Sequence, residues 1–437
     1  MNRPMHWIEG QVDRIVGPTH HFGGLGIGNV ASQAHHGQVS NPAAAALQGL
    51  DKMRLVASLG VPQWILPPQR RPDLGLLRAL GFAGSDDELL RQARDESPTI
   101  LSAAMSCSAM WSANAATVTP GCDGAYPESC LTVANLDASL HRAIEPLQTL
   151  VELQETFGNA VRIFDPLPGG AAMRDEGAAN HMRLACNAGP GVHIFVYGDG
   201  KPRPERYWPR QSLAASQAVA RRHGLRDEFT FFWKQHPRAI DAGAFHNDVV
   251  AMSDGDLMIH HDFAFAETHQ AYSQLEQAFA KRTRRKLTRI EVDETSLSMD
   301  EAVNTYLFNS QILTVDREGE SRVMLCPAEV AENANASRLV QRWRDDGHFS
   351  EIHFVDLRQS MHGGGGPACL RLRVPFPEDE VDSIAPHRRW SERLDGELRK
   401  TIRREYPTHV TLDDLARPDF VAQAIGARDR VAQILCP

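Results

Sequence analysis

Hydrophobic and polar positions alternate in two kinds of block along this chain. The first kind has helical spacing, and the clearest case starts at Asn41-Pro42 and runs to Gly60. An asparagine before the first turn, a proline at its first position and a glycine after its end predict a helix over 42–59. Further helices are expected to begin at Asp86-Asp87 and to span residues 212–223 and 266–286.

The second kind of block is short, apolar and bounded by turn residues, which predicts strands. Residues 248–252 and 257–260 flank the sequence Ser-Asp-Gly-Asp, which favours a hairpin turn. Other strands are expected over 193–197, 352–356 and 369–374. This mixed order lacks a strict strand-helix-strand rhythm. It predicts an α/β fold built from several small ββαβ units, with neither a linker nor a repeat visible at the level of residue identity.

Composition narrows the class of protein. The 437 residues are 42% hydrophobic and 23% charged, as expected for a globular chain, and their number suggests about three domains. With 46 basic and 55 acidic residues the formal charge is −9, and no strongly basic block occurs. We therefore expect no nucleic-acid partner. No apolar run is long enough to span a membrane, and the first residues lack the apolar segment of a signal peptide.

The seven cysteines are odd in number and widely spaced, and none forms a CxxC pair. This pattern predicts neither a disulfide framework nor a zinc site, and it favours a reducing cytoplasm. Each cysteine is then either a small buried hydrophobic residue or a reactive thiol. Paired histidines occur at 20–21, 35–36 and 260–261, but they lack the spacing of metal ligands. We therefore expect no metal.

Cys369 is the cysteine whose surroundings suggest chemistry. It follows the glycine run 363–366 and is predicted to open the strand 369–374. Side chains alternate along a strand, so Cys369 would share a face with Arg371 and Arg373. Nearby cations lower the pKa of a thiol, and the thiolate is a nucleophile. A buried structural cysteine beside an ordinary loop explains the same pattern equally well.

Two shorter patterns suggest acid–base chemistry. His246 and Asp248 would share one face of a predicted strand, where a carboxylate can hold an imidazole in one tautomer or bind a cation. Glu176 follows Asp175 and precedes small residues that allow close packing. Each pattern alone is more often an ordinary turn or loop end.

A glycine-rich segment, THHFGGLGIGN, covers residues 19–29. It has neither the GxxxxGK[ST] nor the GxGxxG spacing of a nucleotide-binding loop. We interpret it as a loop that approaches a substrate closely rather than as a nucleotide site.

Six segments give a specific resemblance when they are taken together and in order. They are HHFGGLGIGN, SANAATV, LHRAIE, DEGAANH, FHNDVV and GGGGPACLRLRV. With them the chain resembles the N-succinylarginine dihydrolase family of the pentein superfamily, from Gly17 into its last hundred residues. The resemblance implies a pentein fold, which is a five-fold pseudo-symmetric α/β propeller of ββαβ modules. Because distant motifs must meet in one central site, residues 1–437 are then expected to form a single domain.

The resemblance also implies roles for individual residues. The nucleophile falls on Cys369, the general acid/base on His246 and the catalytic carboxylate on Glu176. At Gly363 the chain departs from the family, which has an asparagine there. The implied substrate contacts are Gly23, Gly24, Leu25, Gly26, Ile27, Gly28, Asn29, Val30, Ala31, Ser32, Asn114, His141, Arg142, Arg210, Asp248 and Gly363.

These residue types suit a substrate with one planar cation and two carboxylates. Carboxylates accept paired N–H donors from a guanidinium, which Glu176 and Asp248 could do. Arg142, Arg210 and Asn114 could bind the anionic end. The expected reaction converts N2-succinyl-L-arginine into N2-succinyl-L-ornithine, two ammonia and carbon dioxide, the second step of the arginine succinyltransferase pathway.

Other functions stay open at this stage. Another pentein enzyme could act on a different guanidino compound, or release only one ammonia as a deiminase. A non-catalytic protein that binds a guanidino compound is a further alternative. A papain-like protease is disfavoured because its cysteine precedes its histidine, whereas the order here is Glu, His, Cys. The family resemblance further implies a cytoplasmic homodimer without a cofactor.

Overall fold

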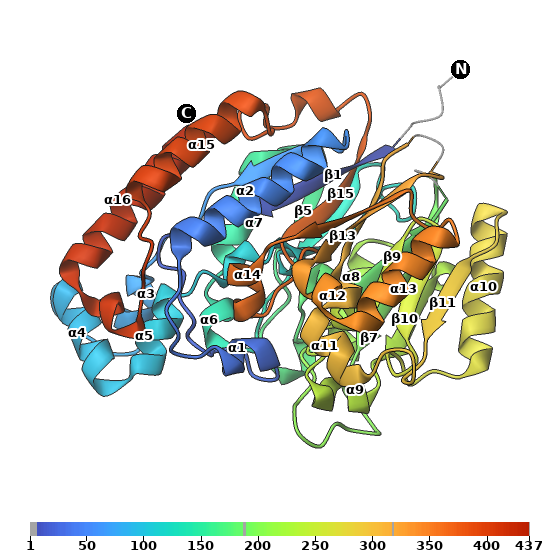
Figure 1. Ribbon diagram of the computed structural model, residues 1–437, viewed down its shortest axis with the longest axis horizontal. Coiled ribbons are helices and arrows are strands. Elements are labelled where there is room, and N and C mark those ends of the chain that lie inside the picture. Colours follow the sequence, from blue (N-terminus) through green and yellow to red (C-terminus); the bar gives the residue numbers. More distant parts are fainter. Residues whose placement is uncertain (1–6, 187–188, 317–318, 437) are drawn as a thin grey trace.

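The computed structural model describes residues 7–186, 189–316 and 319–436, and the named strands in these ranges form five three-stranded sheets (Figure 1). Every sheet has the same topology. Its first two strands are antiparallel, one or more helices follow, and the third strand runs parallel to the second. These are the ββαβ modules expected from the sequence.

The modules follow one another along the chain. The first four consist of β3 (Ala116–Thr119), β4 (Ser129–Val133) and β5 (Val161–Phe164); β6 (His181–Ala185), β7 (Gly191–Tyr197) and β8 (Thr230–Lys234); β9 (Ala251–Asp254), β10 (Leu257–His261) and β11 (Thr288–Val292); and β12 (Gln311–Thr314), β13 (Arg322–Pro327) and β14 (Glu351–Val355).

The fifth module joins the two ends of the chain. Its strands are β15 (Arg371–Pro377), β1 (Trp7–Arg14) and β2 (Gln63–Leu66). Strand β1 lies between the other two and pairs antiparallel with β15, with Asp13 opposite Arg371. Figure 1 shows β1 and β15 side by side, although β1 comes from the start of the sequence and β15 from its last fifth. Strands β3, β6, β9, β12 and β15 contact their neighbours around the centre, β15 with β3 and β9 with both β6 and β12.

The helices lie mainly where their sequence signals predict them. Helix α2 (Pro42–Ser58) begins after Asn41, whose side chain accepts a hydrogen bond from the Ala44 N–H, and Gly60 follows it with a φ of +85°. Helices α4 (Asp86–Glu96) and α8 (Leu213–Arg222) also agree with the prediction. Helix α10 (His269–Thr283) is shorter than predicted, because Thr268 caps its start and Arg284 ends it in the left-handed conformation.

The other helices are shorter connections or cover the sheets. They are α1 (Val30–Ala34), α3 (Leu74–Ala79), α5 (Pro98–Met105), α6 (Leu140–Ala143), α7 (Pro146–Phe157), α9 (Pro237–Ala242), α11 (Met299–Thr305), α12 (Ala328–Glu332), α13 (Ala334–Asp345), α14 (Arg358–Gly363), α15 (Glu392–Glu405) and α16 (Pro418–Leu435), with 3-10 turns η2 (Ser112–Asn114), η4 (Gly177–Asn180), η6 (Asn247–Val249), η7 (Leu307–Asn309) and η9 (Leu412–Ala416) among them.

Two predicted strand boundaries are wrong, and both matter for the site. Strand β9 starts at Ala251, because residues 247–249 form the turn η6, which the Val250 N–H closes onto the Asn247 carbonyl. His246 and Asp248 therefore do not share a strand face. Strand β15 starts at Arg371, since the Cys369 N–H donates back to Gly366 in a turn. Candidate residues thus lie in the turns that lead into the central strands.

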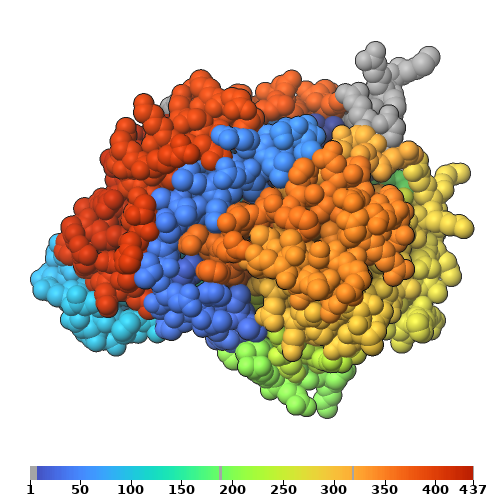
Figure 2. All heavy atoms as spheres, in the orientation of Figure 1, coloured from blue at the N-terminus to red at the C-terminus, as the bar shows by residue number. Residues whose placement is uncertain are grey.

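Helices outside the modules cover one side of the molecule. Leu77, Leu101 and Leu415 belong to a separate apolar cluster that joins α3–α5 to η9. Helix α15 packs on both α16 and α2, and Figure 2 shows these red C-terminal residues against the blue N-terminal ones. Among the helices in the described ranges, none is long and apolar enough to cross a membrane.

Candidate active site

A cavity at the centre of the molecule collects most of the residues predicted from the sequence. We call it the substrate cavity. The predicted residues that line it are Gly23, Gly24, Leu25, Gly26, Asn29, Ser32, Asn114, His141, Arg142, Arg210, His246, Gly363 and Cys369. The segments that carry them span much of the chain, as expected for a central site.

The other predicted contacts lie elsewhere. Ile27 is exposed, and Val30 and Ala31 belong to helix α1. A side chain on Gly28 would approach the Tyr207 ring. Asp248 lines a second cavity, which is described below.

Glu176 is fully buried and anchored at both its backbone and its side chain. Its N–H donates to Gln211 over 2.7 Å, and its carbonyl accepts from the Asn114 amide over 2.9 Å. The carboxylate Oε2 forms an ion pair with Arg142 and lies 2.7 Å from Nε2 of His246. The other oxygen, Oε1, has no hydrogen-bond partner among the described residues. This carboxylate therefore fixes the orientation of the imidazole.

The charges of this group follow from burial and pairing. Burial raises the pKa of Glu176, but Arg142 and the hydrogen bond from His246 outweigh it and hold that pKa well below its usual value. Burial lowers the pKa of His246 to about 4, although Glu176 opposes the shift. The imidazole is thus neutral near pH 7. Nε2 donates to Glu176. Nδ1 has no partner in the part of the chain that the structure describes, so it can accept a proton.

Cys369 lies in the turn before β15 and is only 2% exposed. The Asn309 amide donates to its Sγ over 3.2 Å, and Oδ2 of Asp248 lies 3.6 Å from the same sulfur. The Cys369 N–H contacts Oδ1 of Asn309 at 3.2 Å, and its carbonyl accepts from the Ala113 N–H. Asn309 and Ala113 therefore hold the thiol and its backbone in place.

The prediction that nearby arginines lower the pKa of Cys369 is wrong. Burial and the Asp248 carboxylate raise the pKa of the thiol well above its usual value. Arg373 is paired with Glu9 and Asp254 instead. Arg371 has one long hydrogen bond, of 3.5 Å, to the Ala368 carbonyl. Burial and Asp248 therefore keep the cysteine in its thiol form near pH 7.

Asp248 is placed to respond to a cation. It is half-buried, its Oδ2 contacts the thiol and its Oδ1 has no hydrogen-bond partner. Burial raises its pKa to about 7, although the Cys369 thiol and Arg371 oppose the shift. A guanidinium bound beside Asp248 and Cys369 would favour the charged form of both groups.

The donor groups predicted for the anionic end of the substrate are partly engaged within the protein. Arg142 pairs with Glu176, and the Asn114 amide donates to the Glu176 carbonyl. Arg210 donates to the Ile27 carbonyl, and its guanidinium lies 4.6 Å from the centre of the Phe245 ring. Burial lowers the pKa of Arg210 to about 10, so it stays cationic near pH 7. Arg210 therefore brings positive charge to the cavity wall.

The glycine-rich loop and the glycine run before Cys369 touch each other. The Asn29 amide donates to the Gly364 carbonyl over 3.2 Å, and its oxygen caps helix α1. Gly364 has a φ of +97°, and a Cβ there would lie 1.8 Å from the Asn29 amide nitrogen. A Cβ on Gly363 would lie 2.9 Å from the Trp111 ring. An asparagine at position 363 would therefore require Trp111 to shift.

Sequence reasoning missed several residues of this site. Asn309, which contacts the thiol, lies in no motif that could have revealed it. His20 and Trp111 also line the substrate cavity. His20 is the first residue of HHFGGLGIGN and Trp111 directly precedes SANAATV, so these segments were the available signal. The Nε2 atom of His20 is buried and has no hydrogen-bond partner.

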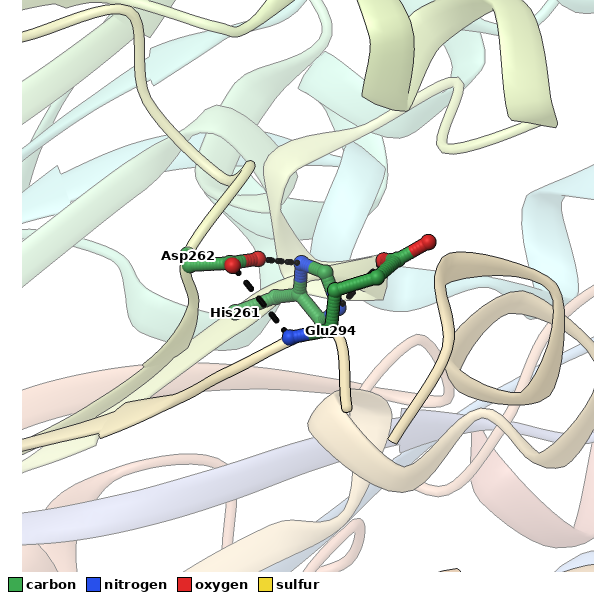
Figure 3. Close-up of side chains that lie close together, drawn as sticks. All are labelled: His261, Asp262 and Glu294. Carbon is green, nitrogen blue, oxygen red and sulfur yellow. Dashed lines mark hydrogen bonds and ion pairs between the residues drawn. The ribbon is translucent and has the colours of Figure 1, made fainter. Parts of the chain in front are cut away.

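A possible metal site lies away from the substrate cavity. Among the described residues, His261, Asp262 and Glu294 place ligand atoms within 4.8 Å of one another (Figure 3). Both ring nitrogens of His261 are already engaged, Nδ1 with the Phe263 N–H and Nε2 with the Leu297 carbonyl. Glu294 is paired with Arg238. These contacts favour a structural role over metal binding.

Comparison with known structures shows the fold. The product-bound N-terminal domain of ArgZ, an arginine dihydrolase from cyanobacteria, matches 84% of this chain and 97% of its own length, with a TM-score of 0.52 and 15% identity. Unliganded AgrE matches 85% of this chain and 40% of its own, with a TM-score of 0.51 and 16% identity. Together with the five ββαβ modules, these matches confirm the predicted pentein fold.

Sequence comparison identifies the family. The N-succinylarginine dihydrolase of Burkholderia thailandensis is 43% identical over 99% of this chain and 98% of its own. That of Burkholderia multivorans is 44% identical over the same shares. A family model described as succinylarginine dihydrolase matches residues 6–436. The chain therefore belongs to the succinylarginine dihydrolase family.

Proposed function

We propose that this protein hydrolyses N2-succinyl-L-arginine to N2-succinyl-L-ornithine, two ammonia and carbon dioxide. Its family supports the substrate. The observation that carries the chemistry is a thiol and a carboxylate-held neutral imidazole on the wall of one buried cavity. Cys369 acts as the nucleophile, His246 as the general acid/base, and Glu176 keeps His246 in the required tautomer.

The first step is attack of Cys369 on the guanidinium carbon. The cationic substrate brings a positive charge next to Cys369 and Asp248, so its arrival lowers the pKa of the thiol. The thiol proton passes to Nδ1 of His246 as the S–C bond forms. His246 then gives that proton to the departing nitrogen, the C–N bond breaks, and ammonia leaves. An S-linked amidino intermediate remains, so the step is balanced.

Water completes the first cycle and the thiol starts the second. His246 takes a proton from the water that attacks the intermediate, which releases a ureido compound and restores Cys369. A second thiol attack on the ureido carbon expels the second ammonia and leaves an S-carbamoyl intermediate. Water then releases a carbamate, which loses carbon dioxide. Covalent catalysis divides each difficult hydrolysis into two smaller barriers.

The guanidinium end and the succinyl end of the substrate bind different groups of residues. Asp248 and the free oxygen of Glu176 accept N–H donors of the guanidinium. Arg210, His141 and the loop residues that line the substrate cavity contact the succinyl end, where burial strengthens the attraction of Arg210 for a carboxylate. These loop residues are Gly23, Gly24, Leu25, Gly26, Asn29 and Ser32. Arg142 acts mainly through Glu176.

Replacing Cys369 with alanine tests the proposal. We expect the variant to release no ammonia from succinylarginine while circular dichroism shows an unchanged fold. The wild type should release two ammonia for each succinylornithine. A ratio near one with a ureido product would instead identify a deiminase, and wild-type turnover by C369A would refute the mechanism.

Three further properties are proposals. We infer one structural domain, because β1 and β15 share a sheet, and expect a single urea unfolding transition. The family resemblance supports a homodimer, which light scattering would detect as twice the 48.4 kDa chain mass. The odd, widely spaced cysteines support a cytoplasmic location, testable by fractionation.

A further inference from the structure

A second cavity lies on the central axis, and none of the described residues that line it also lines the substrate cavity. We call it the axial cavity. Residues of β3, β6, β9, β12 and β15 line it, so the first strand of every module contributes to its wall. Apart from the contact of Asp248 with the guanidinium, the proposed mechanism makes no use of this space.

The two cavities border the same three turns. In each of the pairs 113–114, 246–247 and 368–369, one residue lines the axial cavity and its chain neighbour lines the substrate cavity. Asp248 lines the axial cavity, and its Oδ2 lies 3.6 Å from Sγ of Cys369. The Asp248 carboxylate therefore lies between the thiol and the axial cavity.

The part of the axial cavity next to these turns suits a small neutral molecule. Ala113, Ala178, Ala179 and Ala368 line it with methyl groups. Farther along the wall, Arg373 is neutralised by Glu9 and Asp254.

Opposite charges lie at this end of the axial cavity. Arg371 lines the axial cavity, and its Nε has no hydrogen-bond partner. Asp248 lines the same cavity and interacts with Arg371, so the two charges partly offset each other and the space can take neutral ammonia and water.

We propose that the axial cavity is the path by which ammonia leaves the thiol, and water reaches it, while the succinyl end of the substrate still fills the substrate cavity. This inference rests on the proposed function. Two rounds of C–N cleavage at one carbon require the first ammonia to depart and water to enter before the ureido compound dissociates. A separate path on the far side of the thiol meets that requirement, because it leaves the contacts of the succinyl end intact.

Filling the axial cavity at a distance from the thiol tests the inference. Ser253 lines this cavity on β9, and Val118 lines it on β3. We would measure S253W and V118F, with S253A as a matched control that removes the hydroxyl without adding volume. Each variant is assayed for kcat, for ammonia released per succinylornithine, and for the rate of Cys369 alkylation. The alkylating reagent is chloroacetamidine, which mimics the guanidinium and which we expect to reach Cys369 through the substrate cavity that it lines. Two wall positions are used so that one unfolded variant does not prevent the test.

The expected result is selective. S253W or V118F should lower kcat by about tenfold and release more ureido product, while S253A and the alkylation rate stay within about twofold of wild type. Unchanged kcat and product ratio in a folded, filled variant would overturn the inference. A parallel fall in alkylation would also overturn it, because the substitution would then act on the thiol itself. If the wild type itself released no ammonia from succinylarginine, the proposed function would fail instead.

Discussion

Replacing Glu176 with glutamine changes a charge on which two other buried side chains depend. Arg142 and His246 both contact Oε2 of this carboxylate, and none of the three side chains is more than 4% exposed. E176Q keeps the shape but leaves the Arg142 cation without an anion. Removing one partner of a buried ion pair lowers the free energy of unfolding by about 3–5 kcal/mol. We expect a loss near the lower end of this range, because the amide oxygen of the glutamine can still accept a hydrogen bond from Arg142.

The double variant separates charge from packing. Arg142→Met in the E176Q background removes the unpaired cation, so we expect about 2 kcal/mol of the lost stability to return. The free energy of unfolding is measured in urea for the wild type, both single variants and the double variant. A loss below about 1 kcal/mol in E176Q would refute the view that this pair is buried and strongly coupled.

The pH dependence of the free energy of unfolding provides a second test of the ion pair between Glu176 and Arg142. The pKa of Glu176 lies below that of an unfolded glutamate, about 4.3. The pair therefore contributes its full stability above that pH, and the contribution is lost as the pH falls below about 4.3. E176Q should lose less stability than the wild type over this acidic range. Its kcat should also fall by about a hundredfold or more, because His246 loses the group that fixes its tautomer.

Four other outcomes are expected. Asn309→Ala removes the donor 3.2 Å from Sγ, and kcat should fall about ten- to a hundredfold because a hydrogen bond to a charged sulfur contributes about 1.5–3 kcal/mol; kcat equal to that of the wild type would exclude this role. Because burial and Asp248 raise the pKa of Cys369, alkylation by neutral chloroacetamide should keep increasing above pH 9 in the wild type, and D248N should shift the curve to lower pH; equal curves would contradict the assigned cause. Gly364→Ala should lose about 1–3 kcal/mol of stability and most activity, since φ is +97° and Asn29 occupies the space; urea unfolding and kcat measure both, and a neutral result would show that this turn adapts. Dialysis against EDTA should leave kcat unchanged, since both ring nitrogens of His261 are engaged; loss of activity restored by a divalent metal would disprove this.

The sequence predicted what local signals and motifs encode. Asn41, Pro42 and Gly60 bound a helix through backbone preferences that act within a few residues, and they did so in the structure. The ββαβ order and the meeting of Gly23, His246 and Cys369 at one cavity were likewise predictable, from hydrophobic blocks and family motifs.

What the sequence could not predict depends on contacts between distant segments. The ionisation of Cys369 was predicted from its neighbours along the chain, Arg371 and Arg373. The structure shows that it depends on burial and on Asp248, which comes from another module. Asn309 contacts the thiol across 60 residues of sequence. The start of β15 was misplaced by two residues, because a turn hydrogen bond to Gly366 delays entry into the sheet.

The closure of the fifth sheet also bears on how the protein is made. Strand β1 emerges from the ribosome first, but its antiparallel partner β15 follows only after most of the chain has been synthesised. Until then β1 has an unpaired edge, and such edges pair readily with other chains. Contacts of such large sequence separation also slow folding. Aggregation during expression should therefore depend on the interval between synthesis of the two strands. A circular permutant that joins residue 437 to residue 1 and opens the chain between two modules would separate β15 from β1 only by the segment that carries α15 and α16, and it should aggregate less.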